Sequence, residues 1–221
     1  MSPEPVTLSE FLDRAATHRV ADTDATAHRI LDAAVAEAGA VGLDRVRMED
    51  VVRRSALGRT TVYRRFPSRD DLVRALVARE TERFLAAVTA GMDSVDRPSD
   101  RVVEAFLAAV SFARAHPMLR RMGESAPGSV LDLATTPGIE FLDTGTAFIA
   151  RHLHGGRPGK PARQARWVAD VFARLFLTYL ALPPLDPDVR NDTELRAFAR
   201  AVLTPMAESA APADATGKRV R

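Results

Sequence analysis

The sequence predicts an all-α protein, and three observations lead to that prediction. Apolar residues recur at spacings of three and four along nearly every periodic segment. No stretch alternates apolar and polar residues convincingly, as a half-buried strand would. Stretches rich in proline and glycine, such as HGGRPGKP and PPLDPD, separate the periodic segments as loops between helices do.

Length and composition narrow the class of protein. The 221 residues can bury a sizeable core, and shares of 46% hydrophobic and 27% charged residues are usual for a soluble protein. The absence of cysteine excludes disulfides, thiolate metal sites and a cysteine nucleophile. The first residues, MSPEPVTLSEFLDR, contain no apolar run of the kind that signal peptides have. The most hydrophobic stretch, WVADVFARLFLTYLAL, is too short to span a bilayer, so we expect a cytoplasmic protein.

Two helices are expected before residue 42. Residues 1–23 form an extension with a short helix that starts at Leu8, because Thr7 and Glu10 have the spacing of a capping box. A stronger helix follows and is expected to end at Gly42. Its apolar face consists of Ala27, Ile30, Leu31, Ala34, Val35 and Ala38.

Three helices are expected between residues 48 and 91. One contains the apolar residues of 48–52, and a very short one follows Leu57. The short helix ends near Phe66, because Pro67 disfavours a helical residue before it. Ser68 then caps a long helix that ends by residue 91. Later helices are expected around residues 102–115, 117–124, 138–153, 162–182 and 193–207, and residues 210–221 are expected to be disordered.

Positive charge is concentrated in one part of the chain. The net charge is only +2, but residues 44–83 contain eleven arginines against seven acidic residues. Within them the segment RRSALGRTTVYRRFPSR, residues 53–69, has six arginines and no acidic residue. Such a block of like charge indicates a tail, a solvated face or a site for a polyanion.

Two helical patterns with a turn of about four residues between them fill residues 47–66. This is the scale of a helix-turn-helix, whose second helix is short enough to lie in a major groove. The outward face of that helix would hold Arg59, Thr60, Thr61, Arg64 and Arg65. Arginine matches guanine edges and phosphates, and threonine offers a hydroxyl and a methyl group. The alternative is an arginine-rich exposed face of a helical bundle; the short helix, the acid-free run and the aromatic residue favour DNA.

Several short motifs follow one another between residues 27 and 75. The segment contains HRILDAAVAEAG, then MEDVV, TVY and FPSR. As a set, and without a gap, it resembles the N-terminal DNA-binding domain of the tetracycline-repressor (TetR) family, where Asp-Ile-Ala, Thr-Leu-Tyr and Phe-x-Ser-Lys stand at the corresponding places. Two departures are Ala56, where a turn glycine is usual, and Gly58, where a serine cap is usual.

The resemblance implies an arrangement of domains with different functions along the chain. A three-helix helix-turn-helix domain would occupy residues 24–75, a linking helix would continue to about residue 91, and a larger helical ligand-binding and dimerisation domain would occupy residues 92–209. The base-reading residues would be Arg59, Thr60, Thr61 and Arg64. The phosphate contacts would be Arg47, Tyr63, Arg65 and Arg69. The implied partners are a double-stranded DNA operator, a small apolar effector and a second copy of the chain, with no cofactor and no membrane.

Apolar stripes on the C-terminal helices suggest a pocket and a dimer interface. Phenylalanine and methionine suit an adaptable apolar pocket. The candidate effector-pocket residues are Phe106, Val110, Met118, Met122, Phe141, Phe148, Trp167 and Phe172. The candidate dimer-interface residues are Phe172, Phe176, Tyr179, Phe198, Val202 and Met206. The alternative for both sets is the ordinary core of a monomer.

An enzyme is not expected. His152 and His154 form an HxH pair without a third ligand nearby, and surface histidines at a helix end explain the pair better than a metal site. The sequence has no Ser–His–Asp order, glycine-rich phosphate loop or HExxH motif. We therefore expect a transcription regulator, a repressor that leaves a palindromic operator when its effector binds. The alternatives are an effector-independent architectural DNA-binding protein and a helical metal-dependent hydrolase that uses the two histidines.

Overall fold

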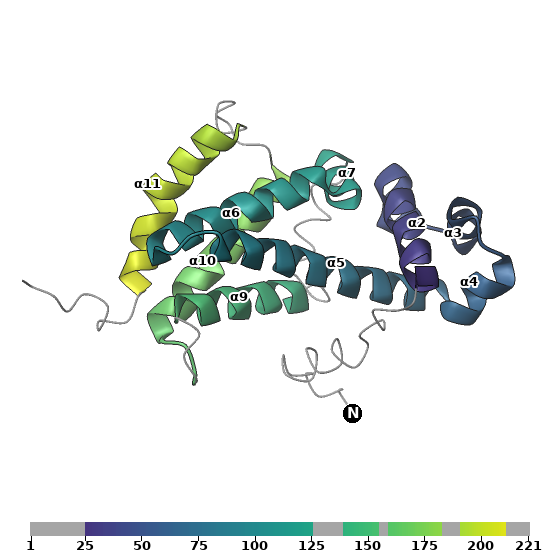
Figure 1. Cartoon of the computed structure of the whole chain (residues 1–221), viewed down its shortest axis with the longest axis horizontal. Helices are drawn as coiled ribbons and strands as arrows, with labels where there is room; N and C mark the ends of the chain where they lie inside the picture. Colours follow the sequence, from purple (N-terminus) through teal and green to yellow (C-terminus); the bar gives the residue numbers. More distant parts are fainter. Residues whose placement is uncertain (1–24, 126–138, 155–158, 183–190, 211–221) are drawn as a thin grey trace, which may run out of the picture. The chain divides into compact units, whose positions relative to one another are not determined.

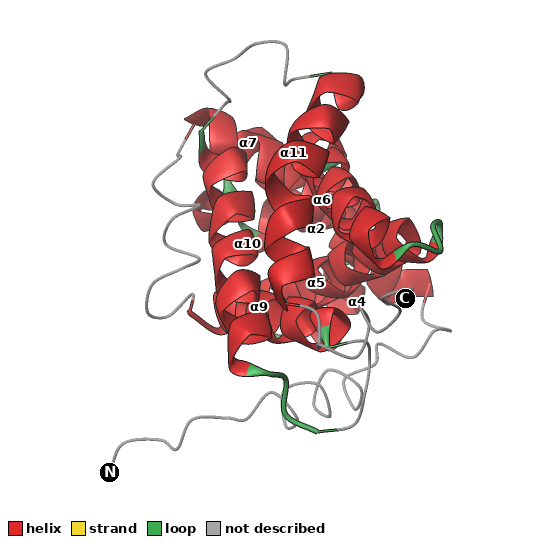
Figure 2. Ribbon diagram, turned by 90° about the vertical axis from the view of Figure 1, so that its left-hand side faces the viewer, coloured by secondary structure: helices red, strands yellow, loops and turns green. Residues whose placement is uncertain are grey.

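The structure of the chain is a computed structural model that describes residues 25–125, 139–154, 159–182 and 191–210 (Figure 1). Every regular element within these ranges is helical, which confirms the all-α prediction (Figure 2). The chain divides into two compact units, residues 1–83 and 84–221, and the division falls inside one long helix. The helix expected from Leu8 and the chain after residue 210 lie outside the described residues.

The first unit contains a small helical cluster and the beginning of the long helix. Its elements are α2 (Ala25–Val41), the 3-10 helix η1 (Leu43–Arg45), α3 (Met48–Ser55), α4 (Arg59–Arg65) and the first part of α5 (Arg69–Asp93). The fully buried side chains of its core include Ile30, Leu31, Val51, Val62, Leu72 and Leu76. The first of these helices ends at the expected place, because Gly42 adopts a φ of +92° and its amide donates to the Ala38 carbonyl at 2.9 Å.

Two small residues shape the turn between α3 and α4. Ala56 adopts the left-handed conformation with φ 52° and ψ 34°, which costs a residue with a Cβ about 1–2 kcal/mol. Gly58 is extended and precedes α4; its carbonyl accepts the amides of Thr61 and Val62. Helix α4 is seven residues long and ends before Phe66. The predicted helix-turn-helix, with its short second helix, is confirmed.

Two buried charged groups tie α2 to its neighbours in the first unit. The Glu37 carboxylate on α2 is buried, and Nε of Arg54 on α3 donates to it at 2.9 Å. Arg79 on α5 is also buried; its Nη1 donates to the His28 carbonyl at 3.2 Å and lies 2.9 Å from Oδ1 of Asp32. A buried charge that loses its partner destabilises a fold strongly, so these pairs help to hold α3 and α5 against α2.

Among its described residues, the second unit contains the end of α5 and five further helices. These are α6 (Pro98–Ala115), α7 (Pro117–Ser125), α9 (Ile139–Leu153), α10 (Arg163–Ala181) and α11 (Asp192–Ala210). A core shared by α6, α10 and α11 contains Val103, Phe106, Leu107, Val110, Val168, Phe172, Leu195 and Leu203. Figure 2 shows α10 and α11 side by side, and the Tyr179 and Phe198 rings meet between them at 5.5 Å.

Helices α6 and α7 meet at a sharp bend. The His116 amide donates to the Phe112 carbonyl at the end of α6, and the His116 carbonyl accepts the Arg120 amide at the start of α7. The bend between the two helices is 84°. No single helix among the described residues is long and apolar enough to cross a membrane; only this bent pair, taken together, has the length and composition.

Candidate nucleic-acid interface

Helix α4 presents polar and cationic side chains to solvent. Val62 is fully buried, which fixes the rotation of the helix about its axis. Arg59, Thr60 and Arg64 are exposed, and Thr61 is half-buried. The four predicted base-reading residues therefore lie together on one accessible helix of seven residues. A helix of this size fits the width of a B-DNA major groove.

The arginines around α4 differ in how they are engaged. Within the part of the chain that the structure describes, the exposed side chains of Arg47 and Arg64 have no hydrogen-bond or ion-pair partner. Arg65 is exposed as well. Arg53 pairs instead with Asp50 on its own helix, at 2.7 Å. Arg47 and Arg64 are thus directed to solvent, as a contact with a phosphate or a base edge would require.

One acidic residue of α3 meets the beginning of α4. The Tyr63 hydroxyl donates to Oε1 of Glu49 at 3.1 Å, and Nη2 of Arg59 lies 3.6 Å from the same oxygen. The Arg59 guanidinium also lies over the Tyr63 ring, 5.1 Å from its centre. We call these three residues the Glu49 cluster. Sequence reasoning missed it; the available signal was an acid in the first turn of α3 and an arginine in the first turn of α4.

The Glu49 carboxylate is held in its charged form. A hydrogen bond from its own backbone amide lowers the pKa of Glu49 most, and the Tyr63 hydroxyl and the positive charge of Arg59 lower it further. A hydrogen bond that favours the charged form of an acid always acts in this direction. A negative charge therefore stands beside Arg59 at neutral pH.

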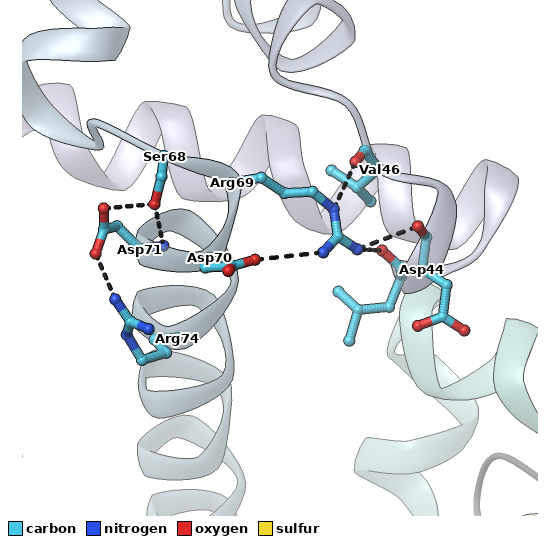
Figure 3. A network of polar contacts seen from close by, with 8 residues as sticks. Asp44, Val46, Ser68, Arg69, Asp70, Asp71 and Arg74 are labelled. Atoms are coloured by element: carbon cyan, nitrogen blue, oxygen red, sulfur yellow. Dashed lines mark hydrogen bonds and ion pairs between the residues drawn. The ribbon is translucent and has the colours of Figure 1, made fainter.

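Arg69, one of the predicted phosphate contacts, makes several hydrogen bonds within its own chain (Figure 3). Its Nε donates to the Val46 carbonyl at 3.0 Å, and its Nη2 donates to the carbonyls of Leu43 and Asp44 at 3.0 and 3.1 Å. Its Nη1 lies 3.7 Å from the Asp70 carboxylate. The planar guanidinium fork supplies donors to main-chain carbonyls in η1 and directly after it. Arg69 thus clamps the start of α5 to the loop between α2 and α3.

The residues next to Arg69 fix the first turn of α5 (Figure 3). The Ser68 hydroxyl accepts the Asp71 amide at 3.1 Å, as the predicted cap should, and donates to the Asp71 carboxylate at 2.6 Å. That hydrogen bond is the main cause that lowers the pKa of Asp71. Arg74 pairs with the same carboxylate from the next turn. The N-terminus of α5 is therefore held both by its own cap and by the Arg69 clamp.

The predicted effector-pocket residues occupy several places in the second unit. Phe106, Val110 and Phe172 belong to the core shared by α6, α10 and α11, and Met118 is buried as well. Met122 and Phe148 are half-buried, each beside a smaller apolar cluster. The side chain of Phe141 is not among those that the structure describes. Trp167 is 58% exposed and stacks under the Arg163 guanidinium at 4.5 Å, so it does not face the core with the others.

The predicted dimer-interface residues mostly pack inside their own subunit. Phe172 is buried in the core, Phe176 contacts the Phe84 ring at 5.1 Å, and Tyr179 meets both Phe106 and Phe198. Met206 packs against the same core. Of the six predicted residues only Val202 is exposed to a large extent, and the other large exposed apolar residues of α10 and its C-terminal end are Trp167, Val171 and Leu182. The stripe on α10 was wide because it combines an inner and an outer face.

The two histidines of the HxH pair lie at the end of α9. Nδ1 of His152 is 2.8 Å from the Phe148 carbonyl, and the His152 ring lies 4.2 Å from the Phe148 ring. His154 is half-buried. No group of three His, Cys, Asp or Glu residues that could hold a metal ion is present among the described residues.

Two family models match the chain on either side of residue 83. The model described as "Bacterial regulatory proteins, tetR family" matches residues 30–76, and the model described as "Bacterial Tetracyclin repressor, C-terminal domain" matches residues 98–202. The chain belongs to the TetR family. As a TetR-family protein it is a DNA-binding transcriptional regulator rather than an enzyme, as expected from the resemblance. Family members typically act as dimers that bind small molecules.

Individual relatives extend over most of the chain. The HTH-type transcriptional regulator AlkX of Mycobacterium tuberculosis is 26% identical over 167 residues, which are 74% of this chain and 76% of the relative. The crystal structure of the repressor AlkX from Dietzia sp. covers 83% of this chain and 98% of its own, with a TM-score of 0.60 and 23% identity. The regulator FadR of Bacillus halodurans covers 80% and 97%, with a TM-score of 0.52 and 13% identity. These similarities support the same helical fold along both units.

Proposed function

We propose that this TetR-family protein is a homodimeric repressor that reads a palindromic operator and leaves it when a small apolar molecule binds. In this proposal residues 24–75 bind DNA, the linking helix continues to about residue 91, and residues 92–209 bind the effector and form the dimer. The observation that carries the proposal is the outward face of α4, where Arg59, Thr60 and Arg64 are exposed while Val62 is buried.

The contacts with DNA are assigned by type of side chain. Arg59, Thr60, Thr61 and Arg64 read base edges, because arginine pairs with guanine and threonine contacts thymine methyl groups or hydrogen-bonding edges. Arg47, Arg65 and Tyr63 contact phosphates, which set affinity and register rather than sequence. Arg69 was predicted for the same group, but its three hydrogen bonds to main-chain carbonyls of its own chain favour a structural role instead.

The dimer interface is proposed on the outer face of α10 and α11. Trp167 and Val171 are one turn apart on α10, and both are exposed, at 58% and 45%. Val202 is exposed on α11. Trp167 is a favourable interface residue because aromatic side chains contribute a large part of the binding energy at protein interfaces. A two-fold dimer also matches the symmetry of a palindromic operator.

The effector is proposed to carry a long alkyl chain. Two proteins of similar structure support this class. The repressor AlkX from Dietzia sp. is implicated in biodegradation of n-alkanes, and FadR from Bacillus halodurans is a fatty acid degradation regulator. The aromatic and aliphatic side chains of α6 and α10, among them Phe106, Val110 and Phe172, suit such a ligand. A ligand that binds more tightly to one conformation of the protein weakens operator binding if DNA binds more tightly to the other conformation.

Selection of bound duplexes from a random pool tests the DNA part of the proposal. We expect an inverted repeat whose half-sites are about one helical turn, or a multiple of it, apart. Arg64→Ala should lose about 1–3 kcal/mol on the selected site and relax the preference at one position. Selected sites without two-fold symmetry would contradict the dimer, and unchanged discrimination by Arg64→Ala would contradict the orientation of α4.

A series of alkanes, alcohols and fatty acids of increasing chain length tests the effector. A true effector raises the melting temperature in a concentration-dependent way, because it binds the folded protein. The same compound should weaken binding to the selected operator. A compound that raises the melting temperature but leaves operator affinity unchanged contradicts induction. Binding only of highly charged compounds contradicts the apolar class.

A further inference from the structure

The Glu49 cluster links the two helices of the helix-turn-helix through side chains alone. Glu49 lies in the first turn of α3, while Arg59 begins α4 and Tyr63 lies one turn further along. One carboxylate oxygen accepts the Tyr63 hydroxyl at 3.1 Å and faces the Arg59 guanidinium at 3.6 Å. The guanidinium is at the same time 5.1 Å from the centre of the Tyr63 ring. Arg59 is therefore held from two directions.

Stability does not explain the cluster. The side chains of Glu49 and Arg59 are 61% and 69% exposed, and an ion pair so open to water contributes little to folding. A carboxylate on a surface that meets DNA also weakens binding, because it repels phosphates. The cluster thus places a negative charge where affinity for DNA alone would favour none. A role in the specificity of DNA recognition would account for it.

We propose that Glu49 is a positioning residue for DNA recognition, which holds Arg59 in one orientation and so sharpens the choice of base that Arg59 makes. The proposal rests on the proposed function of α4. A guanidinium has five N–H donors, so a contact with Glu49 leaves donors free for the O6 and N7 acceptors of guanine. An arginine that is already oriented loses less conformational freedom on binding. Glu49 itself touches no base in this arrangement.

A matched pair of substitutions separates positioning from charge. Glu49→Gln and Asp50→Asn each remove one carboxylate from the first turn of α3, and each weakens the hold on one arginine, Arg59 or Arg53. The amide oxygen of the new glutamine side chain can still accept the Tyr63 hydroxyl, so this hydrogen bond need not be lost. Both should bind every duplex more tightly, because a repulsive charge is gone. Only Glu49→Gln should lower discrimination at the base pair that Arg59 reads, by about 2- to 10-fold, the range expected for one side chain that must be ordered on binding.

The experiment uses the full chain and duplexes derived from the selected operator. Affinity is measured for the best sequence and for single-base-pair variants of the half-site, with wild type, Glu49→Gln, Asp50→Asn, Arg59→Ala and the double variant Glu49→Gln/Arg59→Ala. The base pair that Arg59→Ala relaxes defines the position read by Arg59. Melting temperatures within a degree or two of wild type establish that the two carboxylate variants are folded alike.

The double variant decides how Glu49 acts. If Glu49 works through Arg59, its substitution changes no discrimination once Arg59 is alanine. If Glu49→Gln still changes a base preference in that background, Glu49 reads a base itself, for instance a cytosine amino group, and the proposal is overturned. It is also overturned if Glu49→Gln and Asp50→Asn behave alike in the wild-type background. If the wild-type chain selects no sequence at all, the proposed function fails as well as this inference.

Discussion

The α3–α4 pair and the α10–α11 pair distribute their apolar residues differently. On α4 only Val62 is buried, and polar or charged residues surround it, so a single rotation of the helix satisfies every side chain. On α10 Val168 and Phe172 face the core, whereas Trp167 and Val171 are exposed. A helix with one apolar position has one inner face. A helix with apolar residues on two sides, such as α10, buries one side within its own subunit and leaves the other exposed.

The two pairs are also held by different forces. Around α3 and α4 the contacts between elements include charged groups, such as Arg54 with Glu37 and Arg69 with main-chain carbonyls. Between α10 and α11 they include packed rings, with Tyr179 and Phe198 in contact. Substitutions in the second unit should therefore lower the free energy of unfolding, because burial and packing are lost. Substitutions in the first unit should act through single hydrogen bonds and respond to pH and salt.

The largest effect is expected inside the second unit. Phe172→Ala should lower the free energy of unfolding by about 3–5 kcal/mol, because it removes a buried ring and leaves a cavity. Trp167→Ala removes a larger ring from the same helix but should leave the unfolding of the isolated subunit nearly unchanged, since Trp167 is exposed. Denaturant unfolding at low protein concentration measures both. Equal losses would mean that the inner and outer faces of α10 are assigned wrongly.

The outer face of α10 is tested by one matched pair of valines. Val171→Glu should break the dimer, because it buries an unpaired carboxylate from each subunit at a cost of roughly 3 kcal/mol or more. Val77→Glu is the control, since Val77 on α5 is exposed to a similar extent, 41% against 45%. Sedimentation should show monomers only for Val171→Glu, with weaker operator binding. A dimeric Val171→Glu protein would place the interface elsewhere.

Two neighbouring arginines of α3 sharpen the comparison within the first unit. Arg54→Ala leaves the buried Glu37 carboxylate without this partner and should destabilise the fold by about 1–3 kcal/mol. Arg53→Ala breaks only a pair between an exposed arginine and the half-buried Asp50 of the same helix, and it should change stability by less than about 0.5 kcal/mol. Thermal unfolding distinguishes the two. A similar loss in both variants would show that burial of Glu37 does not matter.

Arg69→Ala separates a clamp from a phosphate contact. Loss of the hydrogen bonds to Leu43, Asp44 and Val46 carbonyls should lower stability by about 1–2 kcal/mol. The salt dependence of DNA binding should stay as in wild type, because no phosphate contact is lost. A phosphate contact would instead reduce the salt slope by about one and leave the melting temperature unchanged. Arg74→Ala, which removes an exposed arginine on the same helix, serves as the control.

The smallest effect is expected at the cap of α5. Ser68→Ala should cost about 0.5–1 kcal/mol through the lost N-cap. The Ser68 hydroxyl also lowers the pKa of Asp71 below its usual value near 3.8. A lowered pKa in the folded state contributes stability above the unfolded value, and that contribution disappears as the pH falls through the folded value. The loss of stability below about pH 4 should thus be shallower in Ser68→Ala, as measured by thermal unfolding at a series of pH values. The same dependence on pH in both proteins would contradict this role for the hydroxyl.

The sequence predicted the helices well because their signals are local. Gly42, Ser68 and the Pro67 that follows Phe66 each act on the adjacent backbone, and all three mark ends or starts of helices in the structure. The side chains that face outward on α4 were predicted for the same reason, since one buried valine leaves a single solution. Family membership followed from the same short region.

Long-range contacts were not predictable in the same way. The residue types at positions 43–46 do not reveal that carbonyls in this segment accept hydrogen bonds from Arg69, because every residue has a carbonyl. The sequence also does not distinguish the two apolar sides of α10. It does not show that Phe176 and Tyr179, which were predicted for the dimer interface, contact aromatic rings of their own subunit. Glu49 was overlooked because its contacts cross the turn to residues ten and fourteen positions later.

The clamp at Arg69 also bears on which positions can vary in evolution. It recognises main-chain atoms, so the side chains of Leu43 and Asp44 can be exchanged without removing its acceptors. Arg69 has no such freedom, since lysine offers a single nitrogen in place of a fork. Tolerance to mutation is therefore unequal on the two sides of one contact: the loop can drift in sequence while the residue that holds it is constrained.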